Sequence, residues 1–262
     1  MRIIYGINPI REALKARKAI KKIEVNETRG GRIVLDLIKE AERLGVSVER
    51  VGREILDMAA GNGRHQGVVA FVEGGFDYVD IEDIINRWRS SGQRALILIL
   101  DSIEDPQNLG SLIRAGCAAG ANGVVMPKDR AAPVTAAVVK ASAGGAEHML
   151  IARVANLNTA IKRLKHEGIW VVGVEADADK NIFTVDLDVD LALVIGGEGK
   201  GLRRLVTWNC DFTVSIPMQG SLGSLNAAQA GVIALFEVVR QKGLSNPRGY
   251  PTQGVIQPKG DR

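Results

Sequence analysis

Continuous apolar runs along the C-terminal two thirds of the chain most constrain its fold. The first run is ALILILD at 95–101, and it ends on an acid. Runs without polar alternation are typical of strands that are buried on both faces of a sheet. Comparable runs follow as GVVMP, HMLIARV, GIWVVGVEA, LALVIGGE and FTVSIP. Because stretches that could be helical separate them, the sequence predicts an α/β domain with a parallel sheet covered by helices on both faces.

The chain is predicted to divide into two domains. The parts are a small α/β domain at 1–74, an interdomain linker at 75–93, a larger domain at 94–243 and a poorly ordered tail at 244–262. Periodicity in the small domain predicts helices near 8–17 and 32–44 and strands near 23–25, 46–51 and 67–72. The linker contains a short amphipathic helix bounded by glycines, and the tail is rich in Pro, Gly and Gln.

The composition excludes several classes of protein. With 46% hydrophobic and 24% charged residues, this is an ordinary folded chain. No stretch reaches the roughly 18 to 20 apolar residues that cross a bilayer, and the N-terminus lacks a signal peptide, so a cytoplasmic location is expected. Cys117 and Cys210 are too few for a disulfide scaffold or a zinc site. Both are expected to be small buried residues, and no metal is expected.

The net charge of +4 is unevenly placed, because the whole excess lies within residues 1–74. A basic cluster in that part comprises Arg11, Lys15, Arg17, Lys18, Lys21, Lys22, Arg29 and Arg32. A solvated helix face is one interpretation of such a cluster. A phosphate-binding surface for nucleic acid is the other.

The stretch VIGGEGKGL at 194–202 suggests a phosphate-binding loop, but both standard motifs fail. A P-loop requires a hydroxyl residue after Lys200, where this chain has Gly201. A GxGxxG motif that starts at Gly197 places Leu202 at its third position. The glycines still permit positive φ and close approach of main-chain groups to a ligand.

Three loops after predicted strands carry polar residues, and such loops gather at one edge of a parallel sheet. The loop after Leu100 leads to Asn108, which could cap the following helix, and to Arg114. The loop after Ile195 is the glycine-rich stretch, and the loop after Ile216 brings Ser224 and Asn226 to a helix start. Each of these residues could be a cap or a solvated charge.

Taken in order, DPQNLGSLIRA, LVIGGEGKGL and VSIPMQGSLGSLNAA resemble the three motifs of the SpoU (TrmH-like) family of RNA ribose 2′-O-methyltransferases, within the SPOUT superfamily. The resemblance covers about 94–243. YGINPIREAL and GRHQGVVAFV resemble the ends of the small substrate-binding domain of the RlmB-like branch, which is itself similar to ribosomal RNA-binding proteins. SLNAAQA stands where the family often has SLNVSVA, so the fine packing of that helix is expected to differ.

The resemblance implies a deep trefoil knot near the C-terminal end of the sheet, S-adenosylmethionine as cofactor and a homodimer packed through the knots. No membrane partner is expected, because no stretch is long and apolar enough to cross a bilayer. Cofactor contacts would come from Gly196, Gly197, Ile216 and Leu225. The catalytic group would be Asn108, Arg114, Glu198, Ser224 and Asn226. The basic cluster would bind RNA.

Methyl transfer to a ribose hydroxyl needs alignment and removal of a proton. His65, His148 and His166 lie outside the motifs and are expected to be structural or solvated. Family mechanisms give the base role to the arginine at Arg114, but a guanidinium normally stays protonated. Arg114 could instead position the phosphate and stabilise the developing oxyanion. Glu198 could orient Arg114 or shape its own loop.

The expected substrate is a guanosine ribose in 23S ribosomal RNA. Alternatives are the same chemistry on tRNA or another rRNA site, and a non-catalytic RNA-binding assembly factor.

Overall fold

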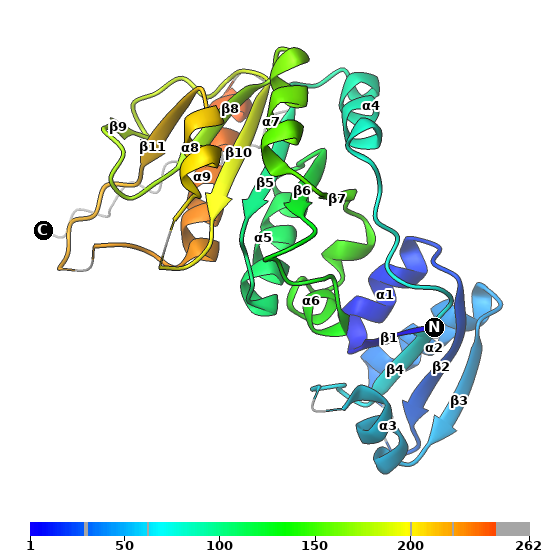
Figure 1. Ribbon diagram of the computed structural model, residues 1–262. Coiled ribbons are helices and arrows are strands. Elements are labelled where there is room, and N and C mark those ends of the chain that lie inside the picture. Colours follow the sequence, from blue (N-terminus) through cyan, green and yellow to red (C-terminus); the bar gives the residue numbers. More distant parts are fainter. Residues whose placement is uncertain (29–30, 62, 200, 222, 245–262) are drawn as a thin grey trace, which may run out of the picture.

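The computed structural model describes residues 1–28, 31–61, 63–199, 201–221 and 223–244. The chain forms two lobes, with the small domain at the lower right of Figure 1. The predictions for Arg29, Lys200 and the tail from 245 onward lie outside the described residues.

The small domain is a four-stranded sheet with helices packed on it. Its strands β1 (Arg2–Tyr5), β2 (Ile20–Asn26), β3 (Ser47–Val51) and β4 (Val68–Val72) have the order β1-β4-β2-β3. Its helices are α1 (Ile7–Lys15), α2 (Arg32–Arg43) and α3 (Arg53–Ala60). The five predicted elements are present. Strand β1 and helix α3 were not predicted, because a four-residue strand and an eight-residue helix show too few periods to stand out.

The segment at 75–93 contains helix α4 (Ile81–Ser91), as the amphipathic pattern predicts. Asp80 begins it, with its N–H donating to Asp83 Oδ2 at 3.0 Å. Ile84 and Ile85 are fully buried in the core of the large domain. A Cβ on Gly123 would lie 2.6 Å from Ile84, so only glycine fits under the helix there. Helix α4 is therefore packed onto the large sheet.

The large domain is built on a seven-stranded sheet in the order β7-β6-β5-β10-β8-β11-β9, and every adjacent pair is parallel. This confirms the predicted parallel sheet. Its strands are β5 (Leu96–Asp101), β6 (Gly123–Pro127), β7 (Ile151–Val154), β8 (Trp170–Val174), β9 (Lys180–Asn181), β10 (Leu191–Gly196) and β11 (Phe212–Ser215). Its helices are α5 (Pro106–Ala118), α6 (Ala136–Ala141), the 3-10 turn η1 (Gly145–Glu147), α7 (Leu157–His166), α8 (Arg204–Asn209) and α9 (Ala227–Leu244).

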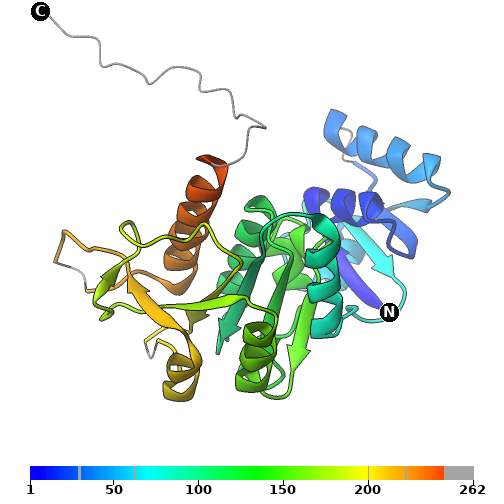
Figure 2. The same ribbon diagram turned by 90° about the horizontal axis from the view of Figure 1, so that it is seen from above.

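Helices cover both faces of this sheet, as Figure 2 shows from above. On β5, Leu98 and Leu100 point into the core that contains α5 and α9. Ile97 and Ile99 point into the other core, with α4, α7 and α8. This two-sided burial explains why the runs carry no polar alternation. The trefoil knot stays a prediction.

Strand β10 lies between β5 and β8, so the chain order is broken at the centre of the sheet. The loops that follow β5, β8, β10 and β11 leave the same edge, because these strands are parallel. Ligands of open α/β sheets bind at such a break.

Direct contacts join the two domains. The Arg2 guanidinium donates to both carboxylate oxygens of Glu147 in η1, at 2.7 and 2.6 Å. The Glu147 side chain is fully buried. His148 Nε2 lies 2.9 Å from Glu12 Oε2 on α1, and Lys140 Nζ in α6 donates to Gln66 Oε1 at 2.5 Å. These contacts fix the small domain against α6 and η1.

The cysteines and histidines vary in exposure. Cys117 and Cys210 are half-buried free thiols, and burial raises the pKa of Cys210 to about 12. His65 is buried and His166 is exposed. Among the described residues, no helix could cross a membrane, and no group of three His, Cys, Asp or Glu side chains could hold a metal ion.

Candidate active site

An asparagine-glutamate cluster joins the three predicted loops. Asn108 on α5 donates through Nδ2 to Glu198 Oε1 at 2.6 Å. Asn226 Nδ2 donates to the same oxygen and to Asn108 Oδ1, the latter at 3.1 Å. The three residues are 90 and 28 positions apart in sequence. The fold thus brings together three of the five predicted catalytic residues.

Helix capping explains how two of these side chains are positioned. Asp105 caps α5, because its carboxylate accepts from the N–H of Gln107 and of Asn108 at 3.2 and 3.1 Å. Pro106 follows at the first helical position. The interpretation of Asn108 as a cap is wrong, and its amide is left free for Glu198.

Asn226 has two tasks at once. Its Oδ1 accepts from the N–H of Ala228 at 2.8 Å and of Gln229 at 3.3 Å, which caps α9. Its Nδ2 donates to the cluster. The cap therefore fixes the amide that holds Glu198.

The glycine-rich loop is tight because two parts of its backbone touch. A Cβ on Gly196 would lie 2.3 Å from the carbonyl carbon of Gly201, and a Cβ on Gly197 would lie 2.3 Å from the carbonyl oxygen of Ser102. Gly199 and Gly201 have φ of 77° and 62°, as the glycine pattern predicts. The loop needs glycine for close approach as well as for conformation.

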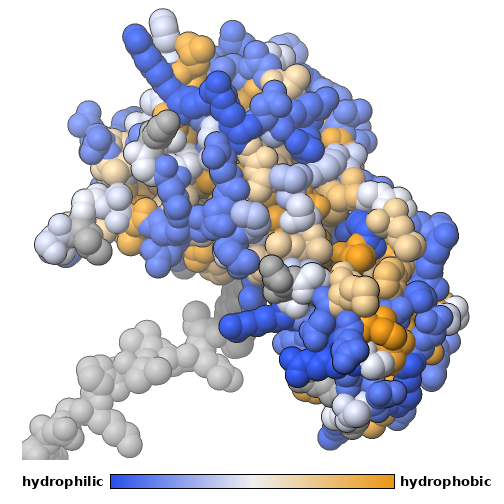
Figure 3. All heavy atoms as spheres, turned by 60° about the horizontal axis from the view of Figure 1, so that its bottom comes forward, coloured by the Kyte–Doolittle hydropathy of each residue, from blue (hydrophilic) through white to orange (hydrophobic). Residues whose placement is uncertain are grey.

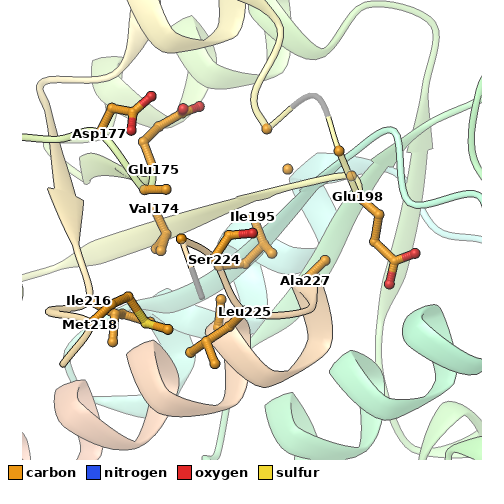
Figure 4. Close-up of a pocket in the computed structure, with 17 residues that line it drawn as sticks. Val174, Glu175, Asp177, Ile195, Glu198, Ile216, Met218, Ser224, Leu225 and Ala227 are labelled. Carbon is orange, nitrogen blue, oxygen red and sulfur yellow. The ribbon is translucent and has the colours of Figure 1, made fainter. Parts of the chain in front are cut away.

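A cavity of about 310 Å³ lies between this loop, the end of β8 and the start of α9. Figure 4 shows Ile216, Met218 and Leu225 on one wall and Glu175 and Asp177 on another. All four predicted cofactor residues line it: Gly196, Gly197, Ile216 and Leu225. Ser224 lines it too and is exposed. The volume falls within the range of small-molecule sites.

The end of β8 was missed by reasoning from sequence. Glu175 and Asp177 line the cavity, and Glu175 Oε1 accepts from the N–H of Leu202 at 2.8 Å, which braces the glycine-rich loop. The acids follow the apolar run GIWVVGVEA, so the signal was visible. Its relevance depends on β8 lying beside β10, and only the strand order shows this.

A second, open cavity of about 920 Å³ lies beside the first. The two share Gly197, Glu198, Gly201 and Ala227 as walls. Three arginines line the open cavity, namely Arg130, Arg203 and Arg204. Of these, Arg203 is bound by the fully buried Asp101, at 2.6 Å between Nε and Oδ1. The acid that ends the first apolar run thus fixes the loop after β10.

Arg114 does not join the cluster. Six residues along a helix correspond to about 9 Å of rise and about 240° of rotation, so Arg114 leaves α5 in another direction than Asn108. It is exposed, and within the described part of the chain it has no ion pair. Glu198 points away from the first cavity in Figure 4 and contacts the two asparagines instead of Arg114.

Much of the predicted basic cluster is neutralised. Lys15 pairs with Glu12 at 2.8 Å, Lys18 with Asp77 at 3.8 Å and Lys21 with Glu73 at 3.0 Å. Lys22 pairs with Glu24 and Glu49. Arg11, Arg17 and Arg32 have no ion pair within the described residues. The cluster does not form one continuous unpaired surface.

Comparison with known proteins agrees with this site. Residues 95–236 match the model of the SpoU rRNA Methylase family, and residues 3–75 match the model for RNA 2′-O ribose methyltransferase substrate binding. The chain belongs to the SpoU family. This confirms the resemblance seen in the three motifs, and the second match agrees with the likeness seen at both ends of the small domain.

Relatives of the SpoU chain match along almost the whole of it. It is 40% identical over 246 residues to the Bacillus subtilis (strain 168) protein called "Putative TrmH family tRNA/rRNA methyltransferase YacO", covering 94% of this chain and 97% of that one.

Two solved structures are similar to the SpoU chain. The SpoU methyltransferase AviRb from Streptomyces viridochromogenes, in complex with AdoMet, has a TM-score of 0.77 at 27% identity and covers 93% of this chain and 91% of its own. The AdoMet-bound rRNA methyltransferase from Sinorhizobium meliloti has a TM-score of 0.74 at 26% identity, covering 91% of this chain and 87% of its own.

Proposed function

We propose that this SpoU protein transfers a methyl group from S-adenosylmethionine to the 2′-hydroxyl of a guanosine ribose in 23S ribosomal RNA. One observation carries the methyl transfer, and the match to the SpoU rRNA Methylase family supports ribosomal RNA as the substrate. The 310 Å³ cavity and the open 920 Å³ cavity meet at Glu198, which the two asparagines hold. A donor in the first cavity and a nucleotide in the second would meet at this wall.

The residues of the first cavity fit this cofactor. Ile195, Ile216 and Leu225 supply an apolar surface for the adenosine part, and the tight backbone of Gly196 leaves main-chain groups free to face it. Glu175 and Asp177 supply negative charge, which suits the positive sulfonium and amino groups. When bound, the cofactor supplies a methyl group that is already activated for displacement.

The chain's own residues then align the ribose and stabilise charge. Both amides donate to Oε1 of Glu198, so this carboxylate is held in one orientation at the boundary of the two cavities. A carboxylate held in this way can accept a hydrogen bond from the 2′-hydroxyl and orient it for attack. Arg130 and Arg204 in the open cavity can bind the phosphates beside the target ribose.

The experiment is incubation with methyl-labelled donor and RNA from a strain that lacks the gene, followed by mapping of the labelled nucleotide. Label at a 2′-oxygen in 23S rRNA is expected. Label in tRNA alone would reject the rRNA substrate and leave the chemistry standing. No label in any RNA would support a non-catalytic assembly factor.

We also propose a homodimer, and the surface of α9 supports it. Its sequence AAQAGVIALFEVV is apolar on all sides, which is typical of a helix buried all round. In the single chain its Phe236 side chain is 44% exposed. We expect a second copy to cover this face, and sedimentation equilibrium of the wild type and of Phe236→Glu tests it. A monomeric wild type would reject the dimer.

Arg114 would act across such a dimer. It lies exposed on α5, which packs against α9, and it points away from the cluster of its own chain. Mixing inactive Arg114→Ala and Glu198→Ala subunits tests this directly. Mixed dimers should regain transfer at one of their two sites if Arg114 serves the partner's site. Continued inactivity of the mixture would place Arg114 in cis or outside the reaction.

A further inference from the structure

Another polar cavity lies in the small domain, away from the basic cluster. It has a volume of about 560 Å³ and is lined by the end of β2, the start of α3 and the loop Gly63–Gly67. Arg53 and Arg64 project from its rim, and both are exposed. Arg64 has no ion pair within the described residues, whereas Arg53 lies 3.4 Å from Asp57. This cavity therefore offers an unpaired guanidinium.

The loop that carries Arg64 is rigid. The N–H of Gly67 donates to Nδ1 of His65 at 3.1 Å, so Nε2 carries the ring proton and donates to Asp57 at 2.8 Å. A Cβ on Gly63 would lie 2.4 Å from the Tyr5 ring, and Gln66 has a φ of 56°. Because these contacts hold the backbone on both sides of Arg64, only its side chain has to be ordered on binding, which lowers the entropic cost.

The same loop is attached to the large domain. Gln66 Oε1 accepts from Lys140 Nζ of α6 and from the N–H of Ile7. Helix α6 packs against α5 so closely that a Cβ on Gly110 would lie 2.4 Å from that of Ala141. Helix α5 begins at the open cavity, where Arg130 lies. A series of direct contacts through α6 and α5 thus connects the loop of Arg64 to the cavity that Arg130 lines.

Helix α6 lies between Arg130 and Arg64, because Arg130 is in the loop that leads into α6 and Lys140 near its end contacts Gln66 in the loop of Arg64. In Figure 1 strands β5 and β10 point downward, and the α3–β4 loop belongs to the small domain at the bottom of the view. Figure 3 brings this end forward and shows hydrophilic side chains on both lobes. The buried Arg2–Glu147 pair is a further direct contact that holds the small domain against η1.

We propose that one RNA strand runs across this face, with Arg130 binding a phosphate near the target nucleotide and Arg64 binding a phosphate further along the strand. The proposal rests on the proposed function for the position of the target nucleotide. The strand passes over α6, which separates the two cavities. A single-stranded RNA loop suits this path, because its bases can be unstacked and splayed out while its phosphates stay accessible.

The test compares Arg64→Gln, Arg130→Gln and the control Arg43→Gln, an exposed arginine on α2 that has no ion pair among the described residues. The probe is a fluorescein-labelled RNA hairpin with a loop of mixed sequence, titrated between about 50 and 200 mM salt. Arg64→Gln and Arg130→Gln should each weaken binding about 3- to 10-fold and lower the salt slope by about one. Arg64→Lys should keep most of the slope. Arg43→Gln should match the wild type.

Calorimetric titration with S-adenosylmethionine should give the same affinity for all variants, which excludes misfolding. If Arg64→Gln binds RNA as the wild type does, or if Arg43→Gln loses as much, the path is wrong. It is also wrong if Arg11→Gln/Arg17→Gln in the basic cluster removes the affinity while Arg64→Gln does not. Methyl transfer by the wild type is scored separately, so a protein that binds this RNA but never methylates would reject the proposed function alone.

Discussion

The two domains hold their functional residues by different means. In the large domain, Asn108, Glu198 and Asn226 are locked to one another by side-chain hydrogen bonds, and glycine backbones touch below them. In the small domain, lysines such as Lys15 and Lys21 are exposed and pair with nearby acids. In the hydrogen-bonded site of the large domain, replacing one residue should therefore cause a large loss of activity. On the small domain, replacing one exposed charge should cause only a small change in binding or stability, and this change should depend on the salt concentration.

Removing the centre of the locked site should have the largest effect. Glu198→Ala leaves the amides of Asn108 and Asn226 without their shared acceptor. We expect kcat to fall by at least about 100-fold, as for the loss of a preorganised polar group. Glu198→Gln keeps an acceptor oxygen and should lose less. Single-turnover methylation measures both variants. If Glu198→Ala lowered kcat by less than about 10-fold, the contrast drawn between the two domains would be wrong.

The next effect concerns the backbone contact under the cofactor cavity. Gly196→Ala places a Cβ 2.3 Å from Gly201, so the loop must shift at a cost of about 1–3 kcal/mol. Calorimetry should show a loss of affinity for S-adenosylmethionine of at least about 10-fold. The matched control is Gly220→Ala, because no atom lies within 4 Å of its added Cβ. Equal affinities in the two variants would show that the contact is not needed.

The junction between the domains supplies a third test. Glu147→Ala leaves Arg2 largely buried without its carboxylate, and breaking a buried pair costs about 3–5 kcal/mol of the free energy of unfolding. Glu73→Ala removes the exposed partner of Lys21 and should cost no more than about 1 kcal/mol. Chemical denaturation measures both. Similar losses would mean that the buried pair at the junction stabilises the protein no more than the exposed pair does.

The smallest effect is expected far from the site, at the end of α9. Burial lowers the pKa of Lys242 from 10.5 to about 8, and its Nζ donates to the carbonyl of Ala95 at 2.6 Å. The unfolded chain therefore binds more protons between about pH 8 and 10, so the free energy of unfolding rises with pH across that window. Lys242→Met should lack this rise while methyl transfer is unchanged. Denaturation at pH 7 and pH 10 measures it, and a parallel rise in the variant would contradict it.

Particular residues show how far prediction from sequence reached. The apolar runs predicted the parallel sheet, because a strand that is buried on both faces carries apolar residues at every position, and this can be seen in each strand's own sequence. The three motifs placed Asn108, Glu198 and Asn226 in one site, and their hydrogen bonds agree. The helix cap was assigned to Asn108 instead of Asp105, because several residues near a helix start can accept the same N–H groups.

What the sequence determined by itself is local: the buried strands of the large sheet, the glycine positions and the family to which the chain belongs. The tertiary structure alone decided which loops meet. The insertion of β10 between β5 and β8 brought Glu175 and Asp177 to the cavity beside the glycine-rich loop, and the contact of Gln66 with Lys140 joined the loop of Arg64 to the large domain. It also decided which basic residues are free, since an ion pair such as that of Lys21 and Glu73 depends on proximity in space. Distances between residues far apart in sequence are set by packing, which no local pattern records.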